Sequence, residues 1–117
     1  MDARTTLKKN SDFRRLYAKG KSAVTPYLVL YSRKNSLPNN RAGFTVSAKL
    51  GNAVTRNRVR RQLREIYRLH LPELKSGRDL ILVARSRCVG GEYGRMDAAF
   101  CKACTALGLW KEEGAGS

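Results

Sequence analysis

Acidic residues, histidine and long apolar runs are all scarce in this 117-residue sequence. Nine Asp and Glu stand against 24 Lys and Arg, and the formal net charge is +15. Self-repulsion of this size destabilises a compact chain, so we expect a polyanionic partner. RNA, DNA and an anionic membrane surface are the candidates.

The sequence also lacks the features of a membrane or secreted protein. No apolar stretch approaches the roughly 20 residues that a membrane-spanning helix needs. The first ten residues, MDARTTLKKN, contain no apolar segment of the signal-peptide type. The cysteine count is three, an odd number that favours reduced thiols. We therefore expect a cytoplasmic protein that does not act on a membrane.

Groups that carry out hydrolysis or bind metals are few. The single histidine is His70, and no carboxylates are paired at a spacing typical of metal-dependent nucleases. Cys101 and Cys104 form a C-x-x-C motif, but zinc usually takes four ligands, and only Cys88 and His70 remain as candidates. The motif also lies within an apolar segment of helical pattern. We predict packed structural thiols, no metal site and no catalytic side chain.

Hydrophobic periodicity, capping residues and turn residues divide the chain into six predicted elements in the order α-β-β-α-β-α. The second and third strands flank a long helix and should be parallel, whereas the first two should be antiparallel if the loop 35–40 forms a hairpin. We predict a single α+β domain over residues 1–117, with a small mixed sheet, helices mostly on one face, flexible ends at 1–6 and 113–117, and a flexible loop over 86–95. The predicted elements are a helix over 9–20, strands over 22–34 and 41–50, a helix over 53–70, a strand over 77–85 and a helix over 96–112.

The segment NAVTRNRVRRQLREIYRLH, residues 52–70, carries six arginines and one acid, Glu65. At about 100° per residue, its apolar and basic side chains fall on separate sides of a helix. The apolar stripe consists of Val59, Leu63, Ile66 and His70. The basic side consists of Asn57, Arg60, Arg61, Arg64 and Arg68, with Arg56 and Arg58 on its flanks.

This basic side favours phosphate binding over a merely solvated surface. Exposed helix faces usually mix acids and bases one turn apart, because such pairs stabilise the helix. Here that support is absent. Arginine can bind phosphate through two parallel hydrogen bonds and can stack on exposed bases. DNA-reading helices usually present a mixed polar surface to base edges, so the nearly uniform arginine side favours RNA and excludes a specific DNA-binding role.

Aromatic residues gather in the predicted first helix and first strand: Phe13, Tyr17, Tyr27 and Tyr31. Aromatic side chains beside basic residues on a sheet can stack single-stranded bases. Aromatics in small domains are more often part of the core. From the residues alone, both interpretations remain open.

The segment KLGNAVTRNRVRRQLREIYR, residues 49–68, resembles the signature of the bacterial ribonuclease P protein family. That signature is an R-N-R triplet that opens a basic helix after a K-x-G-N-A-V-x turn. LKKNSDFRRLYAKGKS, YLVLYSR and RDLILVAR are also similar to segments of the family, and the resemblance spans about residues 7–112. It implies a small α-β sandwich like a domain of a small-subunit ribosomal protein, with a left-handed parallel βαβ crossover against the usual rule.

The resemblance also implies a function: the non-catalytic protein subunit of an endoribonuclease that removes the 5′ leader of precursor tRNA. A catalytic RNA with bound Mg²⁺ would perform the hydrolysis. The residues implied to bind that RNA are Lys49, Arg56, Asn57, Arg58, Arg60, Arg61, Arg64 and Arg68. The residues implied to bind the leader are Lys9, Phe13, Arg14, Tyr17 and Tyr31. The C-x-x-C motif and the Gly-Gly loop depart from the family pattern, and a structural RNA-binding protein of ribosomal or assembly-factor type remains the alternative.

Overall fold

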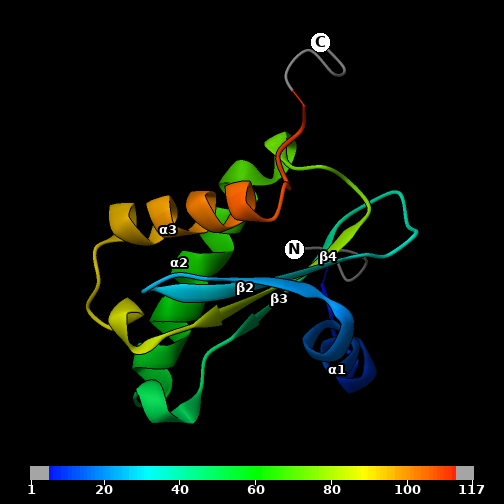
Figure 1. Cartoon of the computed structure of the whole chain (residues 1–117). Helices are drawn as coiled ribbons and strands as arrows, with labels where there is room; N and C mark the ends of the chain where they lie inside the picture. The colour runs from blue at the N-terminus through cyan, green and yellow to red at the C-terminus, as the bar shows by residue number, and fades with distance from the viewer. Residues whose placement is uncertain (1–5, 113–117) are drawn as a thin grey trace.

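The computed structural model describes residues 6–112 and confirms the α+β class. Residues 1–5 and 113–117, which include most of the predicted flexible ends, lie outside the described residues. Thr6, also predicted to be flexible, instead forms a parallel bridge with Ala42. The elements in chain order are α1 (Asn10–Lys19), β1 (Lys21–Val24), β2 (Leu28–Lys34), β3 (Arg41–Thr45), α2 (Ala53–His70), β4 (Arg78–Ala84) and α3 (Tyr93–Ala106) (Figure 1).

The first predicted strand, over 22–34, is wrong as a single element, because it folds into the antiparallel pair β1 and β2. The turn between them is built on Thr25, whose hydroxyl donates to the carbonyl of Leu28 at 2.8 Å and accepts the N–H of Leu28 at 3.0 Å. Pro26 follows within the turn, where its missing N–H costs no ladder bond. The element order is therefore α-β-β-β-α-β-α.

The four strands are arranged in the order β1-β2-β4-β3. β4 pairs antiparallel with β2 and parallel with β3, which confirms the predicted parallel relation across α2. The strands now seen as β2 and β3 run antiparallel, as expected, but they do not form a hairpin, because β4 lies between them. β4 is the most apolar strand and is covered on both faces, which favours the central position. The hand of the β3-α2-β4 crossover stays a prediction.

Other boundaries shift by a few residues. β3 ends at Thr45 rather than at residue 50, because the chain turns into the 3₁₀ helix η2 (Ala48–Leu50). α3 begins at Tyr93 and is shorter than predicted. The predicted flexible loop over 86–95 contains a 3₁₀ turn and a buried Cys88, whose thiol donates to a carbonyl at 2.9 Å. Of the helices in residues 6–112, none is long and apolar enough to cross a membrane.

Helices cover the two faces of the sheet unequally. α2 and α3 pack on one face over the main core, which includes Leu80 and Leu82 of β4. α1 packs alone on the opposite face, where Leu16 contacts Ile81. Successive residues of β4 therefore point to opposite layers, as expected for a strand. Figure 1 shows α1 over only part of its face, so no helix within residues 6–112 covers the rest of that face.

Candidate nucleic-acid interface

α2 is anchored by its apolar side and by a well-formed N-terminus. The Asn52 side chain accepts the N–H of Thr55 at 2.9 Å, a typical N-cap. The predicted apolar stripe is confirmed for Val59, Leu63 and Ile66, which are at most 1% exposed. The stripe continues through the fully buried Tyr67, whereas His70 is only half-buried. This anchoring fixes the opposite side of the helix toward the solvent.

The solvent side of α2 is a surface that we call the arginine face. Most of its side chains are exposed, and Arg56 and Arg60 are half-buried. Within the described residues, none of its six arginines forms an ion pair with an acid. Their charge therefore remains available to an external anion. The arginine face consists of Arg56, Asn57, Arg58, Arg60, Arg61, Arg64 and Arg68.

Local contacts orient part of this face. The Arg56 Nε donates to a carbonyl in the turn before the helix at 3.2 Å. The Arg60 guanidinium donates to the Asn57 amide oxygen at 2.8 Å. The Arg64 guanidinium lies 5.6 Å from the centroid of the Phe44 ring, a cation–π distance. These contacts restrain the three arginine side chains. Each guanidinium group has five N–H donors, so some remain free to bind phosphate.

Lys49 lies in η2, just before the turn that leads into α2. Its side chain is exposed, and its backbone N–H donates to the Ser47 hydroxyl at 3.2 Å. Gly51 makes the turn with φ of 146°, a conformation that favours glycine. The chain therefore places Lys49 at the same end of α2 as the R-N-R triplet, as the resemblance implied.

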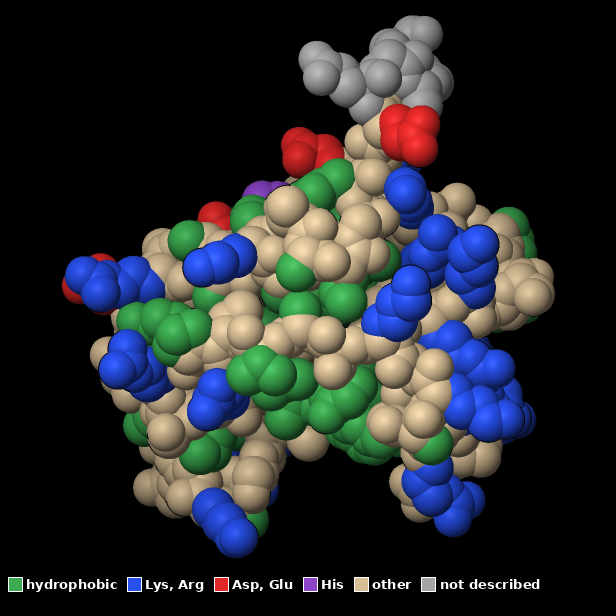
Figure 2. Space-filling model, in the orientation of Figure 1, with side chains coloured by type: hydrophobic (Ala, Val, Ile, Leu, Met, Phe, Trp, Pro, Cys, Tyr) green, Lys and Arg blue, Asp and Glu red, His purple; other side chains and the backbone are tan. Residues whose placement is uncertain are grey.

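The uncovered part of the α1 side forms a second surface, which we call the sheet hollow. In Figure 2 the molecular surface is hollowed beneath the sheet, hydrophobic side chains gather there, and Lys and Arg lie on both flanking lobes. The Tyr17 ring, 42% exposed, meets the Tyr31 ring edge-on at a centroid distance of 4.9 Å. The Tyr17 hydroxyl lies 3.4 Å from that of Thr45. The sheet hollow consists of Tyr17, Val29, Tyr31, Thr45 and Val83.

Phe13 has a different environment from Tyr17, although both were assigned to the leader. Its half-buried ring packs in the α1 cluster and lies directly on the backbone of Gly43. A Cβ at Gly43 would lie only 2.6 Å from the Phe13 ring, so glycine is required for this close approach. Phe13 therefore supports α1 on the sheet, whereas Tyr17 and Tyr31 present ring surface to the hollow. Tyr27 packs against the main core on the other layer.

The two basic residues assigned to the leader, Lys9 and Arg14, are exposed at the start of α1 and on its first half. Their charge lies on the helix that borders the sheet hollow. Arg14 and Tyr17 therefore lie on the same helix, with Lys9 directly before it. The arginine face begins on the other side of the hollow, because the segment 46–52 joins Thr45 directly to α2.

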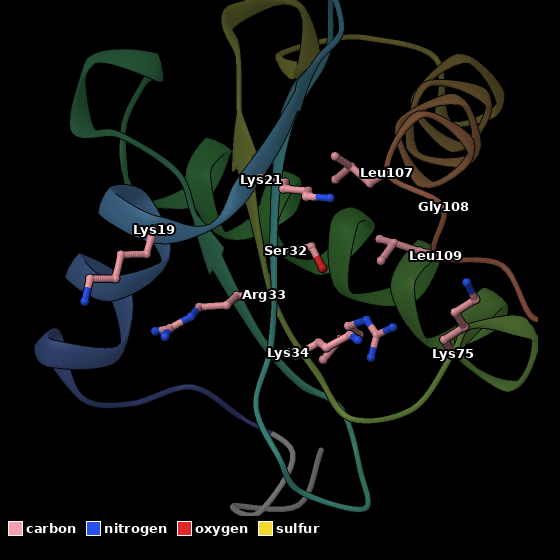
Figure 3. Close-up of a pocket in the computed structure, with 10 residues that line it drawn as sticks. Lys19, Lys21, Ser32, Arg33, Lys34, Lys75, Leu107, Gly108 and Leu109 are labelled. Atoms are coloured by element: carbon pink, nitrogen blue, oxygen red, sulfur yellow. The ribbon is translucent and has the colours of Figure 1, made fainter.

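A third basic surface has no counterpart among the predicted site residues. It is a pocket of about 440 Å³ that contains six Lys and Arg and no acid. Figure 3 shows Lys19 and Arg33 on one side of β2, with Lys34 and Lys75 on the other. Its basic residues come from five separate segments, so no local sequence pattern could have predicted the pocket. The pocket is lined by Lys19, Lys21, Ser32, Arg33, Lys34, Lys75, Arg78, Leu107, Gly108 and Leu109.

Comparison with known proteins identifies the family. A family model described as Ribonuclease P matches residues 1–108. The chain belongs to the ribonuclease P protein family. It is similar to the ribonuclease P protein component of Natranaerobius thermophilus, with 50% identity over 97 residues that cover 83% of this chain and 84% of the relative. It is also similar to that of Clostridium acetobutylicum, with 41% identity over 105 residues, 88% of each chain.

Solved ribonuclease P proteins share the fold. The Staphylococcus aureus protein has a TM-score of 0.83 at 30% identity, covering 92% of this chain and 98% of that one. The Thermotoga maritima protein has a TM-score of 0.76 at 27% identity, covering 83% and 92%. The family resemblance seen in the sequence is thus confirmed. The family functions in processing the 5′ end of tRNA, and membership implies association with the ribonuclease P RNA.

Proposed function

We propose that this chain is the non-catalytic subunit of a ribonucleoprotein ribonuclease P, in which the arginine face binds the catalytic RNA and the sheet hollow binds the 5′ leader of precursor tRNA. The catalytic RNA with its Mg²⁺ supplies the hydrolysis, which releases the leader and leaves a 5′ phosphate on the tRNA. The protein supplies binding and charge. We place it in the cytoplasm, with no role for DNA or a membrane.

The observation that carries this proposal is the arginine face, whose six arginines lack an acidic partner within the described residues. Such a surface lowers the repulsion between two RNA molecules brought together. Arginine forks suit phosphate oxygens, and the mostly uniform surface suits backbone rather than base recognition.

The sheet hollow supports the assignment to a single-stranded leader. It presents the Tyr17 side chain, 42% exposed, beside apolar sheet residues, and bases can stack on such rings without sequence preference. Residues 46–52 connect Thr45, which lies at the hollow, to the start of α2. One RNA-bound protein can therefore contact the leader beside the catalytic RNA. A structural RNA-binding protein would use the arginine face alone and leave the hollow without a ligand.

The decisive experiment compares precursor tRNA and mature tRNA as ligands of the catalytic RNA, with and without the protein. We expect the protein to lower the dissociation constant of the precursor more than that of mature tRNA, because only the precursor has a leader. Equal tightening of both would reject the role of the sheet hollow. No gain in leader removal at low Mg²⁺ would reject the subunit function as a whole.

A further inference from the structure

Three chemically distinct side chains meet where the end of α2 packs against α3. His70 is the last residue of α2, and Asp97 and Cys101 come from α3. The His70 Nε2 lies 2.6 Å from the Asp97 carboxylate and 3.5 Å from the Cys101 Sγ. The Cys101 Sγ lies 3.9 Å from that carboxylate. All three residues are half-buried, and their potential ligand atoms lie within 4.8 Å of one another.

The surrounding structure restrains this cluster. Asp97 and Cys101 are four residues apart on α3, so they project from the same side of the helix. The His70 ring lies between two aromatic neighbours, with centroid distances of 6.0 Å to Phe100 and 5.7 Å to Trp110. The imidazole is therefore held by packing before any ligand arrives.

We propose that His70, Asp97 and Cys101 form a binding site for a zinc-type divalent metal ion, with water as a fourth ligand. Sulfur, imidazole nitrogen and carboxylate oxygen are all zinc ligands, whereas Mg²⁺ prefers oxygen alone. The site is independent of the RNA-binding proposal, because it lies at the opposite end of α2 from the R-N-R triplet. Its inferred effect is to clamp the end of α2 to α3.

The distances fit tetrahedral coordination if the Asp97 side chain moves slightly, away from His70 and toward Cys101. Bonds of about 2.3 Å to sulfur and about 2.0 Å to nitrogen place those two ligand atoms roughly 3.5 Å apart. This matches the 3.5 Å between Cys101 Sγ and His70 Nε2. The hydrogen bond between His70 and Asp97 must open by somewhat less than about 1 Å to admit the ion. The Asp97 side chain is 36% exposed and has room to rotate.

Local charge also favours a cation at this point, although the molecule as a whole is strongly positive. The Asp97 carboxylate lies within the cluster itself, 2.6 Å from the His70 Nε2. Its negative charge would partly neutralise a divalent ion bound there.

The sequence had suggested a different ligand set. The partners considered there for Cys101 were Cys104, Cys88 and His70. The structure buries Cys104 and Cys88 at no more than 1% exposure, and burial raises the pKa of Cys104 to about 12. Cys104 is thus a packed thiol, as predicted. Asp97, which no sequence pattern had selected, lies beside Cys101 instead.

The test titrates the full-length, metal-stripped protein with Co²⁺ and then displaces it with Zn²⁺. We expect one equivalent of Co²⁺ to produce a sulfur-to-cobalt charge-transfer band that Zn²⁺ abolishes. Cys101→Ser should lose the band, and the control Cys104→Ala should keep it. Asp97→Asn should weaken metal affinity by at least about tenfold, since even outer-shell changes have that effect.

Two results would overturn the site: absence of the band in the wild-type protein, or its persistence in Cys101→Ser. Circular dichroism establishes that each variant is folded. His70→Gln serves as a second variant and should also weaken Co²⁺ binding. Unchanged affinity in a folded His70→Gln protein would equally overturn the proposal, because the cluster would then be only an ion pair with a neighbouring thiol.

Discussion

At the scale of single residues, Phe13 and Tyr17 lie one helical turn apart but have different surroundings. Phe13 packs on Gly43 in the α1 cluster, and Tyr17 is 42% exposed at the sheet hollow. An alanine substitution should therefore lower the stability of the protein at Phe13 but weaken RNA binding at Tyr17. The arginine face contains a similar contrast, between Arg64, which stacks on Phe44, and Arg61, which has no protein partner among the described residues.

We predict that Tyr17→Ala weakens leader binding by about 1–3 kcal/mol, because a base loses a stacking surface. Its free energy of unfolding should change little. Phe13→Ala should instead lower the free energy of unfolding by about 2–3 kcal/mol, because it leaves a gap under α1. Urea denaturation and leader-dependent precursor affinity measure the two effects. A Tyr17→Ala protein that binds precursor like the wild type would contradict the proposed stacking.

We predict that Arg61→Ala reduces the salt dependence of RNA binding by about one unit of slope, the value for one lost phosphate contact. The measurement is the binding constant of the catalytic RNA over a series of salt concentrations. Lys102→Ala is the matched control, because it removes one exposed charge from α3 instead. Equal reductions in both variants would mean that net charge, and not the arginine face, sets the affinity.

At the scale of elements, an ion pair joins β3 to β4 at the base of the sheet. The Arg41 guanidinium donates to both carboxylate oxygens of Asp79, at 2.8 Å and 2.6 Å. The Asn35 amide donates to the same carboxylate at 2.9 Å. The hydrogen bond from Arg41 to Asp79 raises the pKa of Arg41 above its ordinary value. The ion pair links β3, the strand that leads into α2, to the central strand β4.

We predict that Asp79→Ala lowers the free energy of unfolding by about 2 kcal/mol, less than for a fully buried pair because Arg41 is partly exposed. Thermal and urea denaturation measure the loss. Arg33→Ala, a change on a neighbouring strand without an ion pair among the described residues, is the control. A loss within about 0.5 kcal/mol for Asp79→Ala would show that the pair adds little.

At the scale of the whole molecule, much of the positive charge lies on three surfaces: the arginine face, the margins of the sheet hollow and the basic pocket beside β2. Only nine acidic residues compensate this charge, and two of them, Asp12 and Asp79, form ion pairs with Arg41. Repulsion must therefore lower the stability of the free protein, and bound anions should restore it.

We predict that sulfate raises the melting temperature more than sodium chloride of equal ionic strength, because bound sulfate bridges clustered cations whereas chloride mainly screens them. Concentrations near one hundred times the dissociation constant should add about 2.7 kcal/mol per site. Differential scanning calorimetry in the two salts provides the comparison. Identical shifts would indicate screening alone.

Features that depend on a local pattern of residues could be predicted without the structure. The arginine face follows from a helical period of apolar residues within a single segment, and the R-N-R signature is contiguous. In β2 the alternation along the strand likewise separates Leu28 and Leu30, which are buried, from Val29 and Tyr31. The net charge, and with it the expectation of a polyanionic partner, follows from composition alone.

Features that depend on contacts between distant segments became known only from the three-dimensional fold. The insertion of β4 between β2 and β3, the basic pocket and the meeting of His70 with Asp97 and Cys101 all join residues far apart in the chain. Phe13 and Tyr17 carry the same aromatic signal in sequence, and packing on Gly43 alone distinguishes them. Local periodicity fixes the direction in which a side chain points, but the partner it meets is fixed by how the layers assemble.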